Sequence, residues 1–228
     1  MGCSLFRADG LDGFNGLFQM VHGDIQRRKE PHLVLGGETQ NAPFHALGHH
    51  LFGRLHSLDA NHQAKTGNGR TGKLYAYQHF GIMPDIVSTA KGLGGGLPIG
   101  ATLMGEKVQN VLKPGDHGST YGGNPVCCAG ALSVIERLDE NFLNAVRRKS
   151  GYVFATLYNA PGIESVTGLG LMIGIKTVKP AKEVVAECMN RGVLCLTAKD
   201  KVRLLPALNI PMDDLCKAID ILKEVCAK

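Results

Sequence analysis

A lysine next to a run of glycines is the first candidate for chemistry in this sequence. Lys91 follows the apolar segment Pro84–Thr89 and precedes Gly92-Leu93-Gly94-Gly95-Gly96. A lysine amine that is partly desolvated at the end of a buried strand can attack an aldehyde and form a Schiff base. The glycines would let the backbone approach a bulky ligand closely. Many lysines beside glycine loops are solvated surface groups, so Lys91 alone does not decide between a catalytic and a surface role.

Two hydroxyl side chains precede a predicted helix start further along the chain. Ser119 and Thr120 stand before a glycine pair, and Asn124-Pro125 is a typical helix start, since Asn caps a helix and Pro fits its first position. Hydroxyls and backbone N–H groups at such a start can cradle a phosphate. The alternative is simple helix capping by Asn124 after a plain turn.

Arg203 lies inside the apolar stretch Val202–Pro206. Arginine is rarely buried without a partner, so an arginine in such a strand suggests a bidentate site for a carboxylate. A surface arginine whose stem lies along apolar neighbours would explain the same pattern.

Two other patterns do not predict sites. Thr66–Lys73 looks like a nucleotide-binding phosphate loop, but Leu74 follows Lys73 where that motif requires Ser or Thr. Four histidines gather before residue 65 with no Cys, Asp or Glu in a standard ligand spacing, so we expect no metal site. They are His45, His49, His50 and His56.

Short strands and amphipathic helices alternate from Thr66 onward, which indicates an α/β fold. The predicted strands cover residues 84–89, 98–104, 168–176, 193–197 and 202–205. Two predicted helices cover residues 141–158 and 180–191. Two more are predicted to begin at Pro125 and near Asp213. Two apolar stripes support the first and last helices: Cys128, Ala131, Leu132, Ile135 and Leu138, and Leu215, Ala218, Ile219, Leu222 and Val225.

Composition bounds the function classes. The chain has 228 residues, a net charge of +5 and 20% charged residues. The basic excess is spread thinly over residues 66–228, so we expect no nucleic-acid binding, and a positive surface suits anionic substrates. We see no transmembrane run and no secretory signal, and we expect a cytoplasmic protein. The seven cysteines form no CxxC pair, so we expect buried, reduced thiols.

Together these pieces resemble one family, the class III, fold-type I aminotransferases that depend on pyridoxal 5′-phosphate (PLP). The resemblance covers residues 66–228 and is closest to the acetylornithine aminotransferases of arginine biosynthesis. It rests on the order and spacing of TGNGRTGKLYAYQHFGIMPDIVSTAKGLGGGLPIGA, GSTYGGNPVCCAGALSVI, GLGLMIGI and VRLLPALNIP.

The resemblance implies a role for each candidate residue. Lys91 matches the Schiff-base lysine, Ser119 and Thr120 match the residues at the cofactor phosphate, and Arg203 matches the arginine that binds the substrate α-carboxylate. The implied reaction moves an amino group from N-acetylornithine to 2-oxoglutarate in a homodimer. The implied fold is the C-terminal part of a PLP-binding large domain, a mixed sheet with helices over 66–139, and a small α+β domain over 140–228.

The sequence departs from the family before residue 66. The family reads D-E-[VI]-Q before T-G-x-G-R-T-G, and its aspartate pairs with the cofactor's pyridinium nitrogen, but here His62-Gln63-Ala64-Lys65 stand in those places. The family's Ser-Gly-x-Glu-Ala phosphate loop is also missing from residues 1–65. We expect that segment to be irregular and to derive from a shifted reading frame or an aberrant gene start.

We therefore expect a truncated and impaired transaminase. The alternatives are a non-catalytic remnant, an ornithine, succinylornithine or 4-aminobutyrate aminotransferase, or a PLP-dependent mutase or epimerase.

Overall fold

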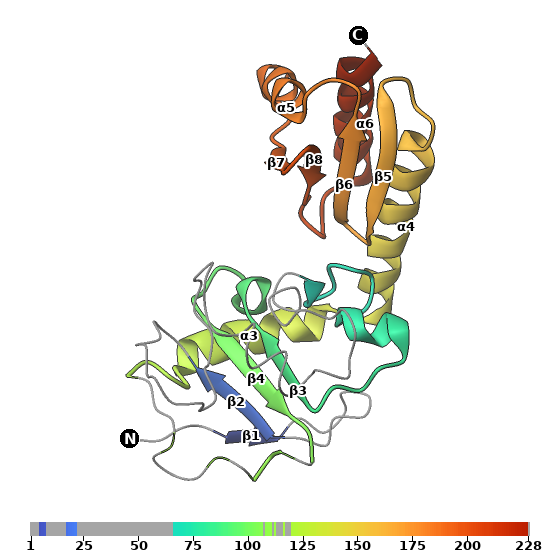
Figure 1. The fold of residues 1–228 in the computed structure, drawn as a ribbon. Helices are drawn as coiled ribbons and strands as arrows, with labels where there is room; N and C mark the ends of the chain where they lie inside the picture. Colours follow the sequence, from blue (N-terminus) through green and yellow to red (C-terminus); the bar gives the residue numbers. More distant parts are fainter. Residues whose placement is uncertain are drawn as a thin grey trace. The chain divides into compact units, whose positions relative to one another are not determined.

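The computed structural model describes two short stretches near the N-terminus and most of the chain from Thr66 onward. The described residues are 5–7, 17–21, 66–106, 108–110, 112, 116 and 120–227. The chain divides into two compact units, one of residues 1–68 and 75–139 and the other of residues 69–74 and 140–228 (Figure 1). The four histidines considered as metal ligands lie outside the described residues.

The first unit contains an antiparallel sheet with the strand order β1-β2-β4-β3 (Figure 1). Its strands are β1 (Leu5–Arg7), β2 (Leu17–Val21), β3 (Ile86–Thr89) and β4 (Gly100–Met104). The strands predicted over 84–89 and 98–104 are confirmed as β3 and β4. Strands β1 and β2 lie inside the segment expected to be irregular. They have 3 and 5 residues, too few for a period-2 pattern to stand out.

Helix α3 (Pro125–Arg137) begins as the sequence predicts. The Asn124 Oδ1 accepts hydrogen bonds from the backbone N–H groups of Val126 at 3.0 Å and Cys127 at 3.2 Å. Pro125 occupies the first turn, where its missing N–H costs nothing. The predicted cap at Asn124 is therefore confirmed.

The buried face of α3 differs from the predicted stripe. Cys128 and Ala131 are buried, but Leu132 is 49% exposed and Cys127 is buried instead. The helix lies against the loop that contains the short 3-10 helix η2 (Lys91–Gly94). A Cβ at Gly130 would stand 2.5 Å from Leu97 Cδ1, so the glycine permits a close approach of this loop to α3.

The second unit packs three helices on a four-stranded antiparallel sheet with the order β5-β6-β8-β7 (Figure 1). Its elements are α4 (Glu140–Leu157), β5 (Ile163–Leu169), β6 (Met172–Thr177), α5 (Ala181–Asn190), β7 (Leu196–Ala198), β8 (Lys201–Leu204) and α6 (Met212–Ala227). One hydrophobic core joins the helices to β6 and β8. Its members with at most 1% exposure are Val153, Leu157, Ile173, Ile175, Val184, Cys188, Val202, Ile219, Leu222 and Val225.

The single strand predicted over 168–176 is wrong. The structure has a hairpin there, because β5 ends at Leu169 and β6 begins at Met172. Gly170 has φ +60°, the left-handed conformation that reverses the chain, and Leu171 at the turn is fully buried. Strand β5 escaped prediction because its side chains are half-buried or exposed and show no apolar alternation.

The remaining predictions in this unit are confirmed within a few residues. Helices α4, α5 and α6 match the ranges predicted from amphipathic periodicity. Gly192, at φ +85°, follows α5 as a left-handed C-terminal glycine. On α6 the predicted stripe is buried at four positions, and Ala218 is half-buried. No helix in the described residues has the length and hydropathy to cross a membrane.

The cysteines of the second unit are core residues. Cys188, Cys195 and Cys226 are buried and unpaired by disulfides. Burial raises the pKa of Cys188 to about 12 and that of Cys226 to about 11. Such thiols stay protonated and unreactive at neutral pH, which confirms the expectation of buried, reduced thiols for these positions.

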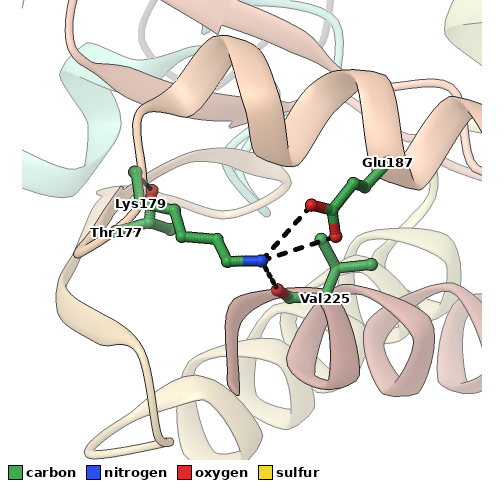
Figure 2. Close-up of polar contacts among 4 residues, drawn as sticks. All are labelled: Thr177, Lys179, Glu187 and Val225. Atoms are coloured by element: carbon green, nitrogen blue, oxygen red, sulfur yellow. Dashed lines mark hydrogen bonds and ion pairs between the residues drawn. The ribbon is translucent and has the colours of Figure 1, made fainter. Parts of the chain in front are cut away.

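A charged side chain closes the end of α6. Lys179 Nζ donates to the carboxylate of Glu187 on α5 at 3.3 Å and to the backbone carbonyl of Val225 on α6 at 3.1 Å (Figure 2). Thr177 Oγ1 donates to the Lys179 carbonyl at 2.8 Å and fixes the turn that presents this lysine. Without the bond from Lys179, the Val225 carbonyl in the last turn of α6 would have no partner within the helix.

The variant Lys179→Met should lower the free energy of unfolding by about 1 kcal/mol, since it removes a charge-assisted bond but keeps the stem. Urea unfolding followed by circular dichroism measures this change. The matched control is Lys182→Met, at an exposed position on α5, with no expected effect. Equal stability of the two variants would show that the contact contributes nothing.

Candidate active site

Lys91 stands directly beyond a buried strand in an unusual backbone conformation. Strand β3 ends at Thr89, which is 2% exposed, and Lys91 opens η2 with φ +61°. A left-handed conformation costs a non-glycine residue about 1–2 kcal/mol. Strain of this kind concentrates at functional sites, where the surrounding structure maintains it.

The side chain of Lys91 is exposed in this structure. The partly desolvated amine predicted from the sequence is not found among the described residues, because Lys91 is exposed. Leu93, two residues further on, is fully buried and anchors the loop to the core. The fold thus holds the backbone on both sides of Lys91, while the residue itself is exposed.

Arg203 occupies a middle position of β8, opposite Gly174 of β6 and Leu196 of β7. Its neighbour Val202 points into the core and is fully buried, so Arg203 lies on the other face of the sheet. Gly174 presents no side chain beside it, which leaves room for the guanidinium stem.

The Nε atom of Arg203 has no hydrogen-bond partner. Among the described residues it is the only buried side-chain nitrogen or oxygen in that condition. A buried donor without an acceptor costs about 1–3 kcal/mol. A ligand carboxylate would supply the missing acceptor, so this observation favours the carboxylate site over the alternative of a surface arginine.

Of the two predicted phosphate-binding hydroxyls, the structure describes that of Thr120 only. Thr120 is exposed in the turn that leads to the cap of α3. Ser119 lies outside the described residues. Lys91 and Thr120 belong to the first unit and Arg203 to the second.

The segment before these elements holds two residues that sequence reasoning missed. Asn68 is buried and donates to the carbonyl of Ala90 at 3.0 Å. Arg70 donates to the carbonyls of Leu171 at 3.3 Å and of Pro206, just beyond β8, and burial lowers its pKa. Asn68 thus contacts the chain just after β3 in the first unit, and Arg70 contacts the chain next to β6 and β8 in the second.

No group of three or more His, Cys, Asp or Glu in the described part of the chain could hold a metal ion. The chemistry of the described candidates is instead that of an amine and a guanidinium.

A family model described as aminotransferase class-III matches residues 63–226. This chain belongs to the class-III aminotransferases. The match covers all four candidate residues and begins near the change in sequence character around residue 65. Class-III aminotransferases are PLP-dependent enzymes with an α/β fold, as the sequence resemblance implied.

Curated relatives carry the same family assignment. An acetylornithine aminotransferase of Haemophilus ducreyi is 46% identical over 168 residues, which cover 73% of this chain and 43% of the relative. An acetylornithine aminotransferase of Corynebacterium efficiens is 41% identical over 227 residues, 99% of this chain and 54% of the relative. The chain thus spans about half the length of these relatives. The second alignment also includes residues before 63, and the proposed origin of residues 1–65 stays a prediction.

Solved structures give a similar result. The N-acetylornithine aminotransferase of Stenotrophomonas maltophilia superimposes with a TM-score of 0.64 at 31% identity, over 72% of this chain and 45% of that protein. A Toxoplasma gondii ornithine aminotransferase with partial occupancy of PLP at its active site has a TM-score of 0.67 at 31% identity, over 72% of this chain and 42% of that protein.

Proposed function

We propose that this chain carries part of the active site of a PLP-dependent transaminase that moves an amino group from N-acetylornithine to 2-oxoglutarate. The observation that carries the proposal is Lys91, an exposed amine on a left-handed residue directly after a buried strand. Support for the donor comes from relatives named acetylornithine aminotransferase at 41% to 46% identity.

The described residues fit the cofactor in two respects. Lys91 is an exposed residue whose backbone is fixed by buried neighbours, as a covalent anchor for an aldehyde requires. The buried, unpartnered Nε of Arg203 suits the carboxylate that every amino-acid and 2-oxo-acid substrate carries. The positions of the missing aspartate, His62–Lys65, lie outside the described residues.

The chain's residues divide the work of transamination. PLP, when bound, supplies the electron sink that lets the bond between the substrate Cα and its hydrogen break. Lys91 Nζ would hold the cofactor until the substrate's amino group replaces it there. The released amine would then take the proton from the substrate Cα. The fork of Arg203 would bind the α-carboxylate and set the orientation of that Cα. The hydroxyls of Ser119 and Thr120 would donate hydrogen bonds to the cofactor phosphate.

Three finer parts of the proposal stay predictions. The chain is expected to act in a homodimer, with Thr120 serving the partner's cofactor, and to be cytoplasmic. Because His62-Gln63-Ala64-Lys65 stand where the family has its aspartate motif, we propose that the chain's activity is impaired.

The deciding experiment is an absorbance spectrum of the purified chain with PLP, followed by borohydride reduction and peptide mapping. A single reduced adduct on Lys91 supports the proposal. Adducts scattered over many lysines, or no adduct, would leave a non-catalytic remnant. Where Lys91 is labelled, glutamate formation from 2-oxoglutarate with N-acetylornithine, ornithine, succinylornithine or 4-aminobutyrate then identifies the donor.

Ornithine is the second candidate donor, because ornithine aminotransferases are among the similar structures, with TM-scores of 0.63 to 0.67. The donor series above separates the two. Faster glutamate formation with ornithine than with N-acetylornithine would replace the proposed donor and leave the roles of Lys91 and Arg203 unchanged.

The variant Arg203→Lys should raise the dissociation constant for 2-oxoglutarate at least about tenfold, because a lysine cannot supply the bidentate fork. PLP labelling of Lys91 should stay at the wild-type level. Isothermal titration with 2-oxoglutarate measures the first effect and peptide mapping the second. Lys201→Arg, at another position of β8, serves as the matched control. Unchanged affinity in Arg203→Lys would remove Arg203 from substrate binding.

A further inference from the structure

Asn68 contacts the chain on the N-terminal side of the candidate anchor lysine. Its side-chain Nδ2 donates to the backbone carbonyl of Ala90 at 3.0 Å, and its Oδ1 accepts from Thr89 Oγ1 at 3.4 Å. The two contacted residues immediately precede Lys91. Asn68 is 8% exposed and Thr89 is 2% exposed, so both bonds are shielded from water. Buried bonds of this kind define geometry better than exposed ones.

The carbonyl that Asn68 binds belongs to the peptide that leads into Lys91. This peptide is planar, so fixing its oxygen also fixes the N–H and the Cα of the next residue. The same oxygen accepts from the Leu93 N–H, but at 3.4 Å. The bond from Asn68 is shorter by 0.4 Å (3.4 − 3.0), which makes the asparagine the stronger of the two described partners.

The chemistry of the neighbours sets the orientation of the amide. A backbone carbonyl only accepts, so the NH₂ end of Asn68 must face Ala90. The oxygen end then faces the hydroxyl of Thr89, which can donate. Thr89 is 2% exposed at the end of β3, so the hydroxyl that orients the amide is itself buried.

The backbone of Asn68 explains why this residue type suits the position. Its φ is +54°, in the left-handed region that asparagine adopts more readily than most residues. Glycine would adopt that conformation but would offer no amide. Lys91 has the same kind of conformation at φ +61° and, as a lysine, needs outside contacts to keep it.

We propose that Asn68 is a positioning residue for Lys91, holding the Ala90 carbonyl so that the lysine keeps its left-handed conformation and aims its amine at an aldehyde. The inference rests on the proposed function for the role of the amine. The hold on the backbone is independent of that function. The experiment below therefore separates the two.

The test compares Asn68→Asp with the wild-type chain. Aspartate keeps the shape, the tolerance of positive φ and the acceptor for Thr89, but it turns the donor to Ala90 into a repelling oxygen. The matched control is Asn159→Asp, since Asn159 is an exposed asparagine with φ +58° in the other unit. Thr89→Val is the second variant, because it removes the hydroxyl that orients the amide and leaves Asn68 in place.

Two readouts are needed. The first is the rate of borohydride-trapped PLP attachment to Lys91, which should fall about tenfold in Asn68→Asp because the amine is displaced. Reductive methylation of Lys91 by formaldehyde should keep its wild-type rate, because this small reagent needs only an accessible amine. The second readout is deuterium exchange of the backbone amides in peptides covering residues 90–96, measured without PLP. This exchange should become about tenfold faster, because the bond from Asn68 to the Ala90 carbonyl is lost.

Each result decides something. Wild-type PLP attachment and exchange in Asn68→Asp would overturn the inference. Equal changes in Asn159→Asp would overturn it too, because the effect would then be general. If the wild-type chain never labels Lys91 selectively, the proposed function fails, and the exchange alone decides whether Asn68 holds this segment. If Asn68→Asp does not fold, wild-type exchange at 90–96 in Thr89→Val would overturn the inference.

Discussion

The variant Lys91→Ala is expected to abolish selective, borohydride-stable labelling by PLP, a loss of at least about 100-fold. The reason is that the covalent bond forms only at an amine that the fold presents. Strand β3 and the buried Leu93 fix the backbone on both sides of Lys91, and its amine is exposed. Peptide mapping after reduction measures the effect. The control is Lys73→Ala, since Lys73 is another exposed lysine of the described chain and should leave the labelling of Lys91 unchanged.

A companion variant separates the anchor role from backbone strain. Lys91→Gly also loses the amine, but glycine adopts φ +61° without a Cβ clash. It should therefore be more stable than Lys91→Ala by about 1 kcal/mol in urea unfolding without PLP. Equal stability of the two variants would show that no strain is stored at this position. Selective, borohydride-stable labelling by PLP at the wild-type level in either variant would remove Lys91 from the proposed mechanism.

The candidate residues were predictable because their signals are local. A lysine after an apolar run, and an arginine within one, can be read from a handful of neighbouring residues. The supporting contacts are not local. Asn68 meets Ala90 across 22 positions, and Arg70 meets Leu171 and Pro206 across 101 and 136 positions. Hydrogen bonds over such separations depend on the tertiary fold, so spacing within the TGNGRTG motif could not reveal them.

The errors in the predicted fold have equally specific causes. Helical periodicity placed α3 correctly, but it offered more than one apolar face. The loop with η2 packs against the helix close to Gly130, and Leu132 is exposed. The hairpin of β5 and β6 was missed because Gly168 and Gly170 were interpreted as the entry to a strand. The conformation at Gly170 makes it a reversal of the chain instead.

The variant Gly162→Ala is expected to destabilise the second unit by about 4 kcal/mol or more, a large part of a typical domain's stability. Gly162 precedes β5 with φ +76°, and an added Cβ would stand 1.8 Å from the carbonyl oxygen of Cys226. No side-chain rotation can relieve this contact, because the obstacle is the backbone of α6. The carbonyl of Gly162 also accepts from the Val178 N–H at 3.0 Å, so moving the turn would disturb the end of β6 as well.

Gly192→Ala separates the clash from the backbone conformation. Gly192 has φ +85° and nothing lies within 4 Å of an added Cβ, so this variant should cost only about 1 kcal/mol. Urea unfolding combined with deuterium exchange assigns each loss to a unit. The first unit should keep its exchange rates in both variants, because Gly162, Gly192 and α6 all belong to the second unit. Equal losses in the two variants would mean that α6 moves away at little cost, and that the packing of its end contributes little to the core.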